Sequence, residues 1–199
     1  KPGDVIAADA LTYTGFKLLA ESLHLEIVPV PATETGPDLE AFEALCRRRS
    51  VRAVYSMPTL HYPLGWVMDA RWLDQFVSIA RQHDLLIIED DIYADFQDGA
   101  VTRLATLDAE QRVIYLASFS KTLSSSLRVG FVVAGCAVIA RLAEVKMITG
   151  MGASRFCESV LACLLANGAY GKLVQRQRQR LNNDRLAVLQ MLEDAEWEV

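Results

Sequence analysis

The chain has 199 residues, of which 52% are hydrophobic and 23% charged, enough apolar material for one substantial core. Its net charge of -5 does not indicate a domain that binds nucleic acid, and we interpret its two basic clusters, at 47–49 and 176–180, as solvated helix surface. No apolar run reaches the roughly 18 residues of a membrane span. The four cysteines show no metal-ligand spacing, so we expect a reduced, cytoplasmic protein without membrane contact.

Strand and helix patterns alternate through the first part of the chain. Short apolar runs predict strands, and the amphipathic segments between them predict helices, two of which begin at aspartates suited to capping. In chain order, we expect a strand at 5–8, a helix at 15–23, a strand at 25–30, a helix at 38–47, a strand at 51–56 and a helix at 69–82.

The second part of the chain continues with strands and ends in helices. Its apolar runs are uninterrupted, which is typical of strands covered on both faces. We expect strands at 85–88, 113–117 and 129–134, followed by helices at 137–149, 154–167 and 170–194. The irregular stretch at 97–110 is long for a simple connection, so we expect it to border a site.

This alternation predicts an α/β fold with three layers, in which helices cover both faces of a mostly parallel sheet. Ligands of such sheets bind beyond the carboxyl ends of the strands. Unusual polar sequence follows three of the expected strands: MPTLHYPLG after the strand at 51–56, EDDIYADF after 85–88 and SFSK after 113–117. We therefore expect one site along this edge.

The segment after the strand at 113–117 combines an amine with phosphate-type donors. Lys121 can form an imine with an aldehyde if desolvation frees its amine. Ser118, Ser120 and Arg128 offer hydroxyl and guanidinium donors for a phosphate. A solvated loop lysine is the alternative interpretation.

Asp90 ends an apolar strand, where a carboxylate is costly unless a cation meets it. A protonated pyridine nitrogen is such a cation, and Tyr93 can reach a phenolic oxygen on the same ring. Aldehyde, phosphate, ring nitrogen and phenolic oxygen are the four functional groups of pyridoxal 5'-phosphate (PLP). The alternatives are a structural role for Asp90, with Asp91 as a second candidate, and a core position for Tyr93.

Together these motifs carry a family resemblance. PTLHYPLG, IIEDDIYADF and SFSKTLSSSLRVGF resemble the large domain of fold-type I PLP-dependent aminotransferases of class I and II. Within that family, the chain most resembles the aminoadipate/kynurenine type and the aminotransferase-like domain of MocR-type transcriptional regulators of the GntR family. The resemblance extends over essentially the whole chain, and the linked spacing of the motifs makes it specific.

The resemblance implies a role for each matching residue. Lys121 corresponds to the lysine that binds the cofactor covalently and later carries the substrate proton. Asp90 corresponds to the partner of the ring nitrogen, which keeps the ring protonated as an electron sink. Tyr93 corresponds to the donor to the ring oxygen O3'. The implied phosphate ligands are Ser118, Ser120 and Arg128.

One position departs from the family pattern. The family commonly has Asn-Pro-x-Gly, in which Asn also bonds O3', whereas this chain has HYPLG with Tyr62 in the place of Asn. An aromatic residue here resembles some MocR-type regulators and implies weaker transamination, so Tyr62 is a candidate cofactor-binding residue. We interpret the neighbouring His61 as an ordinary loop histidine, with a supporting donor role as the alternative.

The resemblance also implies a domain organisation. Residues 1–194 correspond to the PLP-binding large domain, incomplete at its N-terminus, and 195–199 to the start of the small C-terminal domain, so we expect a fragment. One open function is a regulator that senses PLP and an amino acid or amine, contacting DNA only through a winged helix-turn-helix outside this chain. The other is a working amino acid aminotransferase. A homodimer is implied in both cases.

Overall fold

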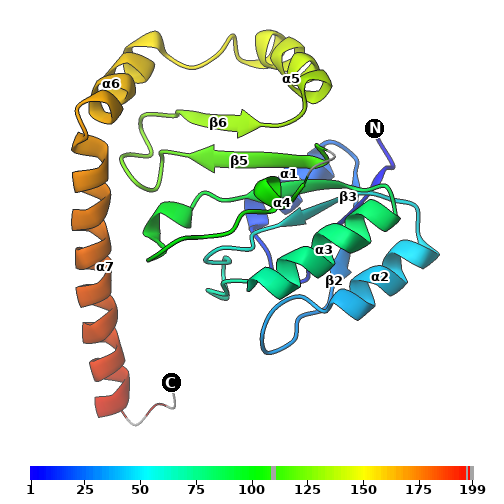
Figure 1. The fold of residues 1–199 in the computed structure, drawn as a ribbon, viewed down its shortest axis with the longest axis horizontal. Coiled ribbons are helices and arrows are strands. Elements are labelled where there is room, and N and C mark those ends of the chain that lie inside the picture. Colours follow the sequence, from blue (N-terminus) through cyan, green and yellow to red (C-terminus); the bar gives the residue numbers. More distant parts are fainter. Residues whose placement is uncertain (109–110, 196, 198–199) are drawn as a thin grey trace. The chain divides into compact units, whose positions relative to one another are not determined.

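The computed structural model describes residues 1–108, 111–195 and 197, and the chain divides into two compact units. Unit 1 comprises residues 1–117 and 130–151, and unit 2 comprises residues 118–129 and 152–199. Every strand and helix expected from the sequence is present, with ends within two residues of those predicted (Figure 1).

The described residues form one six-stranded sheet in the order β2-β1-β3-β4-β5-β6. The strands are β1 (Val5–Asp9), β2 (Glu26–Val30), β3 (Val51–Ser56), β4 (Leu86–Asp90), β5 (Val113–Ser118) and β6 (Gly130–Val133). Neighbouring strands from β2 to β5 are parallel, and β6 runs opposite to β5 (Figure 1). The prediction of a mostly parallel sheet is confirmed.

Two of the helices begin at the aspartates that the sequence marks as caps. Asp38 accepts a hydrogen bond from Ala41 N at 2.9 Å, and Asp69 accepts one from Trp72 N at 2.7 Å. The helical elements are α1 (Thr14–Ser22), α2 (Leu39–Arg48), α3 (Ala70–Gln82), the 3-10 turn η1 (Ala94–Phe96), α4 (Leu104–Leu107), α5 (Cys136–Thr149), α6 (Arg155–Ala166) and α7 (Ala169–Asp194).

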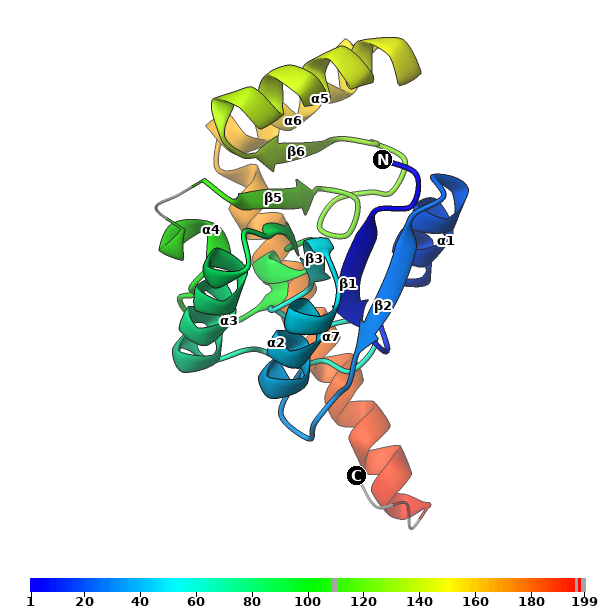
Figure 2. The same ribbon diagram turned by 90° about the vertical axis from the view of Figure 1, so that its right-hand side faces the viewer.

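Successive strand residues point to opposite faces of the sheet, and this alternation builds the layers of unit 1. Val54 and Ile87 belong to a core that includes the buried faces of α2 and α3. Tyr55 and Ile88, one residue further along each strand, pack instead with Phe16 of α1. Figure 2 accordingly shows α1 on one face of the sheet and α2 and α3 on the other. The expected three-layer α/β/α arrangement is confirmed.

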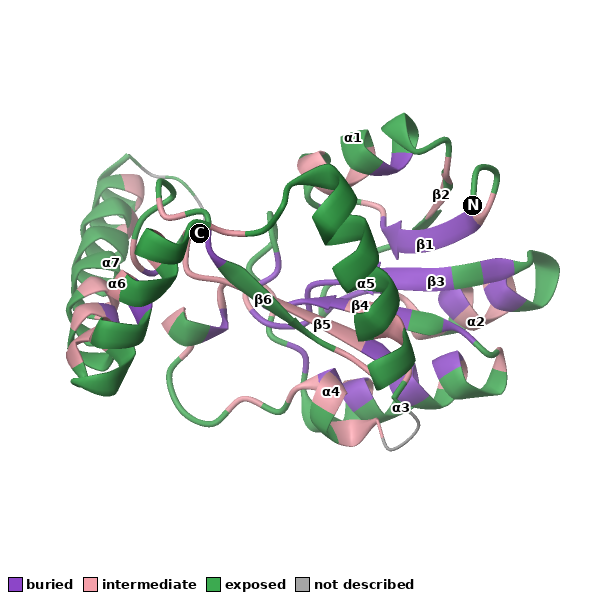
Figure 3. Ribbon diagram, turned by 90° about the horizontal axis from the view of Figure 1, so that it is seen from above, coloured by how far each residue is buried: buried purple, intermediate pink, exposed green. Residues whose placement is uncertain are grey.

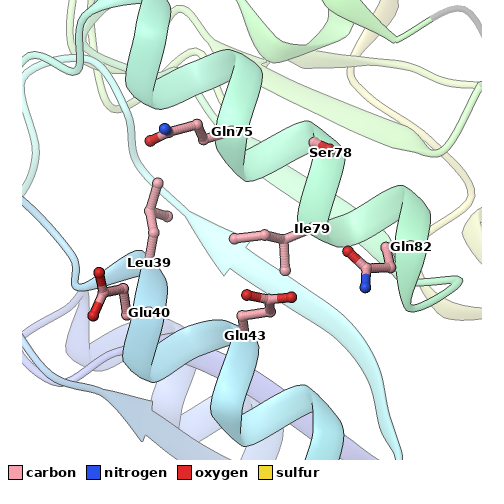
Figure 4. A pocket seen from close by; sticks show the side chains of 7 residues that line it. All are labelled: Leu39, Glu40, Glu43, Gln75, Ser78, Ile79 and Gln82. Atoms are coloured by element: carbon pink, nitrogen blue, oxygen red, sulfur yellow. The ribbon is translucent and has the colours of Figure 1, made fainter.

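Helices α2 and α3 pack together through aromatic side chains. The rings of Phe42 and Phe76 lie 5.3 Å apart, and those of Trp72 and Phe76 lie 4.8 Å apart. Towards solvent a shallow groove remains between the two helices (Figure 4), lined by Leu39, Glu40, Glu43, Gln75, Ser78, Ile79 and Gln82. No lining side chain is cationic and two are glutamates, so the groove offers a phosphate no positive charge.

Strand β6 differs from its prediction in burial. The apolar run at 129–134 predicts a strand covered on both faces, but all four residues of β6 are exposed. Helix α5 has no buried residue either, as the green ribbon of both elements in Figure 3 shows. The prediction that β6 is covered on both faces is therefore wrong, because β6 is an edge strand and α5 does not bury it.

Glu89 of β4 anchors the start of α4, which lies within the stretch at 97–110 expected to be irregular; residues 109–110 of that stretch lie outside the described residues. Glu89 is fully buried, and its two carboxylate oxygens accept hydrogen bonds from Leu104 N at 2.8 Å and Ala105 N at 2.9 Å. These two amides begin α4, where backbone N–H groups lack partners within the helix. Burial raises the pKa of Glu89 to about 7, although the two amide donors lower it.

This titration should make the stability of the fold depend on pH. The pKa of Glu89 in the folded state lies above its ordinary value of 4.5. The contribution of Glu89 to the free energy of unfolding is therefore fully present below pH 4.5 and is lost as pH rises through about 7. In Glu89→Gln, the unfolding free energy should therefore fall less between about pH 5 and pH 7 than in the wild type, by on the order of 2 kcal/mol. Denaturant titration at both pH values measures the difference.

The matched control is Glu40→Gln, which changes an exposed carboxylate in the first turn of α2. This variant should keep the pH dependence of the wild type. Equal pH dependence in the wild type and Glu89→Gln would contradict the assignment of the titration to Glu89.

Candidate active site

The carboxyl ends of three parallel strands in unit 1 carry buried polar residues. Asp9 ends β1 and is 6% exposed, and Asp90 ends β4 and is 8% exposed. Tyr55, next to the last residue of β3 and between these two strands in the sheet, is 2% exposed. Buried carboxylates are costly without partners, so their contacts determine what the site can bind.

Tyr55 provides the contact to Asp90. Its hydroxyl donates a hydrogen bond of 2.5 Å to Asp90 Oδ2. Burial, followed by the negative charge of Asp90, raises the pKa of Tyr55 and keeps its hydroxyl protonated as a donor. A buried carboxylate held in one orientation at a strand end is suited to a protonated ring nitrogen.

Asp91, the second candidate in the sequence, is engaged by structural contacts. Its Oδ2 accepts hydrogen bonds from Arg103 Nε and from the Tyr115 hydroxyl, both at 2.8 Å. Burial raises the pKa of Asp91, and both of these donors oppose the rise. Asp91 thus holds Arg103, directly before α4, to the sheet, which favours Asp90 over Asp91 as the ligand-binding carboxylate.

His61 is buried and pairs with the end of β1. It is 2% exposed, and its Nε2 lies 3.1 Å from Asp9 Oδ2. The ring of Trp66 packs beside it, with centroids 4.9 Å apart. Burial raises the pKa of Asp9, and the hydrogen bond to His61 opposes the rise. The interpretation of His61 as an ordinary loop histidine is wrong, because the side chain ties the loop after β3 to β1.

Aromatic side chains extend the site beyond these carboxylates. Tyr62 is 48% exposed, and its ring meets that of Tyr13 edge-on at 6.4 Å. Tyr13 and Asp9 both act electrostatically on Tyr55, raising its pKa further. Tyr93 is half-buried and packs on the same side of the sheet as Tyr55. Unit 1 therefore brings Asp90 together with aromatic residues suited to a planar ring.

The remaining predicted residues lie in unit 2, at the last residue of β5 and on the loop that follows it. The loop closes at its base through a hydrogen bond from Phe119 N to Val129 O of 3.1 Å. Ser118 Oγ accepts a hydrogen bond from Ser120 N at 3.2 Å, and Lys121 follows directly. The predicted amine and hydroxyl donors thus share one short, closed segment.

Arg128 adopts an uncommon backbone conformation near the end of this loop. Its φ is +52°, in the left-handed region that residues with a Cβ rarely occupy. Such conformations cost free energy and cluster at ligand-binding segments, where the surrounding structure maintains them. The conformation is compatible with the expected role of Arg128 as a phosphate ligand.

The residue after Lys121 anchors the loop to the start of α7. Thr122 is 1% exposed, and its Oγ1 accepts a hydrogen bond from the Tyr170 hydroxyl at 3.1 Å. The same tyrosine ring meets Phe119 edge-on at 5.6 Å. These contacts restrain the backbone on both sides of Lys121.

Tyr55 and Asp9 are the residues of the site that the sequence reasoning missed. The sequence predicts Tyr55 only as part of the strand at 51–56, although a buried tyrosine hydroxyl requires a hydrogen-bond partner. The parallel register pairs Tyr55 with Ile88, two residues before Asp90 on the neighbouring strand. That combination is the signal from which the contact could have been inferred.

Two kinds of feature are absent among the residues that the structure describes. No helix among them is long and apolar enough to cross a membrane. They also contain no group of three or more His, Cys, Asp or Glu side chains arranged to hold a metal ion.

Comparison with known proteins identifies the family. The family model described as aminotransferase class I and II matches residues 1–199. The chain belongs to this family. The resemblance on which the expectations of fold and site residues rest is therefore confirmed at the level of the family.

Proteins similar to this chain include both regulators and enzymes. The uncharacterized HTH-type transcriptional regulator YisV of Bacillus subtilis is 29% identical over 97% of this chain and 40% of its own length. Aromatic-amino-acid aminotransferase 1 of Thermococcus litoralis is 26% identical over 97% of this chain and 48% of its own length. The chain thus spans less than half the length of these relatives.

A solved enzyme has the same fold. The structure of LysN, the α-aminoadipate aminotransferase of Thermus thermophilus, complexed with N-(5'-phosphopyridoxyl)-L-leucine, superposes with a TM-score of 0.91 and 28% identity. The match covers 98% of this chain and 51% of that one.

Proposed function

We propose that the chain is the PLP-binding, aminotransferase-like domain of a MocR-type transcriptional regulator of the GntR family, which senses PLP together with an amino acid or amine. The observation that carries the proposal is the buried Asp90 carboxylate, fixed by Tyr55 at the carboxyl edge of a parallel sheet. Regulators among the similar relatives support the choice of a sensor.

The residues of the site fit the functional groups of the cofactor. Asp90 is suited to hold the ring nitrogen, and Tyr93 and Tyr62 to approach the ring oxygen. Lys121 offers the amine for the aldehyde. The proposed phosphate ligands are Ser118, Ser120 and Arg128. PLP, when bound, supplies a protonated ring that withdraws electrons from the bound amino compound.

A working amino acid aminotransferase of the aminoadipate/kynurenine type is the second candidate function. It is favoured by the likeness to LysN. The departure at Tyr62 favours the sensor, because a tyrosine replaces the asparagine expected beside the ring oxygen. We further propose a cytoplasmic homodimer, in which DNA is contacted through a winged helix-turn-helix outside these 199 residues. The net charge of -5 of these residues supports placing the DNA contact outside them, because a negatively charged domain offers few contacts to phosphate groups.

One experiment distinguishes the two functions. PLP and a panel of amino acids and amines are added to the full-length protein that contains these 199 residues, while the visible spectrum, the release of 2-oxo acid and the binding of genomic DNA fragments are followed at about 150 mM salt. A sensor should change its spectrum and its DNA affinity with one class of amine and release little oxo acid. Steady release of oxo acid without any effect on DNA would contradict the regulator.

A further inference from the structure

We propose that Tyr55 is a positioning residue that tunes Asp90 toward the ring nitrogen of the cofactor. The inference rests on the proposed function, since it takes Asp90 as the partner of that nitrogen. It is carried by the 2.5 Å hydrogen bond from the Tyr55 hydroxyl to Asp90 Oδ2, between two buried side chains on neighbouring strands.

The surroundings of Tyr55 keep its hydroxyl in place as a donor. The ring of Phe16 stacks on that of Tyr55, with centroids 3.9 Å apart and planes at 8°. The raised pKa of Tyr55 keeps the phenol protonated, so the hydrogen bond runs from tyrosine to carboxylate. Asp9 and Tyr13 contribute to the same rise, which links the end of β1 to this contact.

The hydrogen bond has a definite electrostatic consequence for Asp90. Donation to a carboxylate favours its charged form and withdraws electron density from its oxygens. A carboxylate that lacks this donor is more basic, and a proton shared with a ring nitrogen then moves toward oxygen. Because the contact is buried, little solvent screens the change. Tyr55 thus helps to keep the proton on the ring.

The chain contains a matched control for this chemistry. Tyr115 on β5 donates a hydrogen bond of 2.8 Å to Asp91, the residue after Asp90. Tyr115→Phe therefore removes the same hydroxyl from the same kind of buried carboxylate, one residue outside the proposed site. Any general effect of losing a tyrosine–aspartate bond should occur in both variants.

The test compares Tyr55→Phe with Tyr115→Phe in the protein loaded with PLP labelled with ¹⁵N in its ring. We expect Tyr55→Phe to bind PLP about tenfold more weakly, because Asp90 is no longer held in one orientation toward the ring nitrogen by a charge-assisted bond. The ¹⁵N resonance should also move from the pyridinium position toward that of neutral pyridine. Tyr115→Phe should keep both wild-type values.

The outcomes separate this inference from the proposed function. A folded Tyr55→Phe with the wild-type ¹⁵N resonance overturns the inference, as do equal shifts in both variants. If Tyr55→Phe does not fold, replacement of Tyr55 by 4-aminophenylalanine, a weaker donor of nearly the same size, should move the resonance toward neutral pyridine, and no movement overturns the inference. Failure of the wild-type protein to bind PLP overturns the proposed function, and with it this inference.

Discussion

Replacing Lys121 by alanine should abolish the covalent attachment of PLP and slow any amino-group transfer by roughly a thousandfold or more, equivalent to about 4 kcal/mol in the barrier. The reason is chemical, because the amine is both the nucleophile toward the aldehyde and the carrier of the substrate proton. No other residue of the loop at 118–129 carries an aliphatic amine. Visible absorption before and after borohydride, followed by peptide mapping, measures the attachment.

Lys146 provides the control for this measurement. It lies in the last turn of α5 and is exposed, so Lys146→Ala removes a lysine without touching the proposed site. Borohydride should fix the cofactor on the peptide that contains Lys121 in the wild type and in Lys146→Ala alike. Labelling of another lysine in the wild-type protein would show that the assignment of Lys121 is wrong.

The fold was largely predictable because its signals are local. Short apolar runs, amphipathic segments and the caps at Asp38 and Asp69 specify the elements and their ends. Alternation of strands and helices then selects a parallel sheet with helices on both faces. The exposure of β6 was not predictable. An apolar run indicates that a strand is suited to burial, but it does not indicate which elements of the fold cover that strand.

The site was predictable where its residues follow strand ends. The position of Asp90 and the order of polar residues after β5 are readable directly, because parallel strands end at one edge of the sheet. The partners of these residues are not readable in the same way. Tyr55 and Asp90 are 35 residues apart, and His61 and Asp9 are 52 apart, so only the packed sheet reveals these contacts.

The three acidic residues at the end of β4 show how packing resolves what sequence leaves open. Glu89, Asp90 and Asp91 are consecutive, and their alternation along the strand sends neighbouring side chains to opposite faces. Glu89 caps α4 and Asp91 binds Arg103, whereas Asp90 meets Tyr55. The sequence shows that three acidic residues lie together, and only their contacts in the structure show that each has a different role.

Asp90→Asn should keep PLP on Lys121 but slow any proton removal from the bound amino compound by about a hundredfold to ten-thousandfold, or roughly 3–5 kcal/mol in the barrier. Asparagine is nearly the same size and can still accept the hydrogen bond from Tyr55, so the fold should survive. It carries no charge, however, and a neutral amide does not hold the proton on the ring nitrogen. Without that charge, the ring is a poorer electron sink. The rate of the spectral change after an amino compound is added measures the effect.

Asp91→Asn is the matched control, because it removes a buried charge at the neighbouring position. Its carboxylate binds Arg103 and Tyr115 and has no assigned contact with the cofactor. This variant should lose stability, by about 1–3 kcal/mol for a weakened buried hydrogen-bond set, while the folded fraction keeps the wild-type rate. An undiminished rate in Asp90→Asn would contradict its pairing with the ring nitrogen. A large loss of rate confined to Asp91→Asn would transfer that role to Asp91.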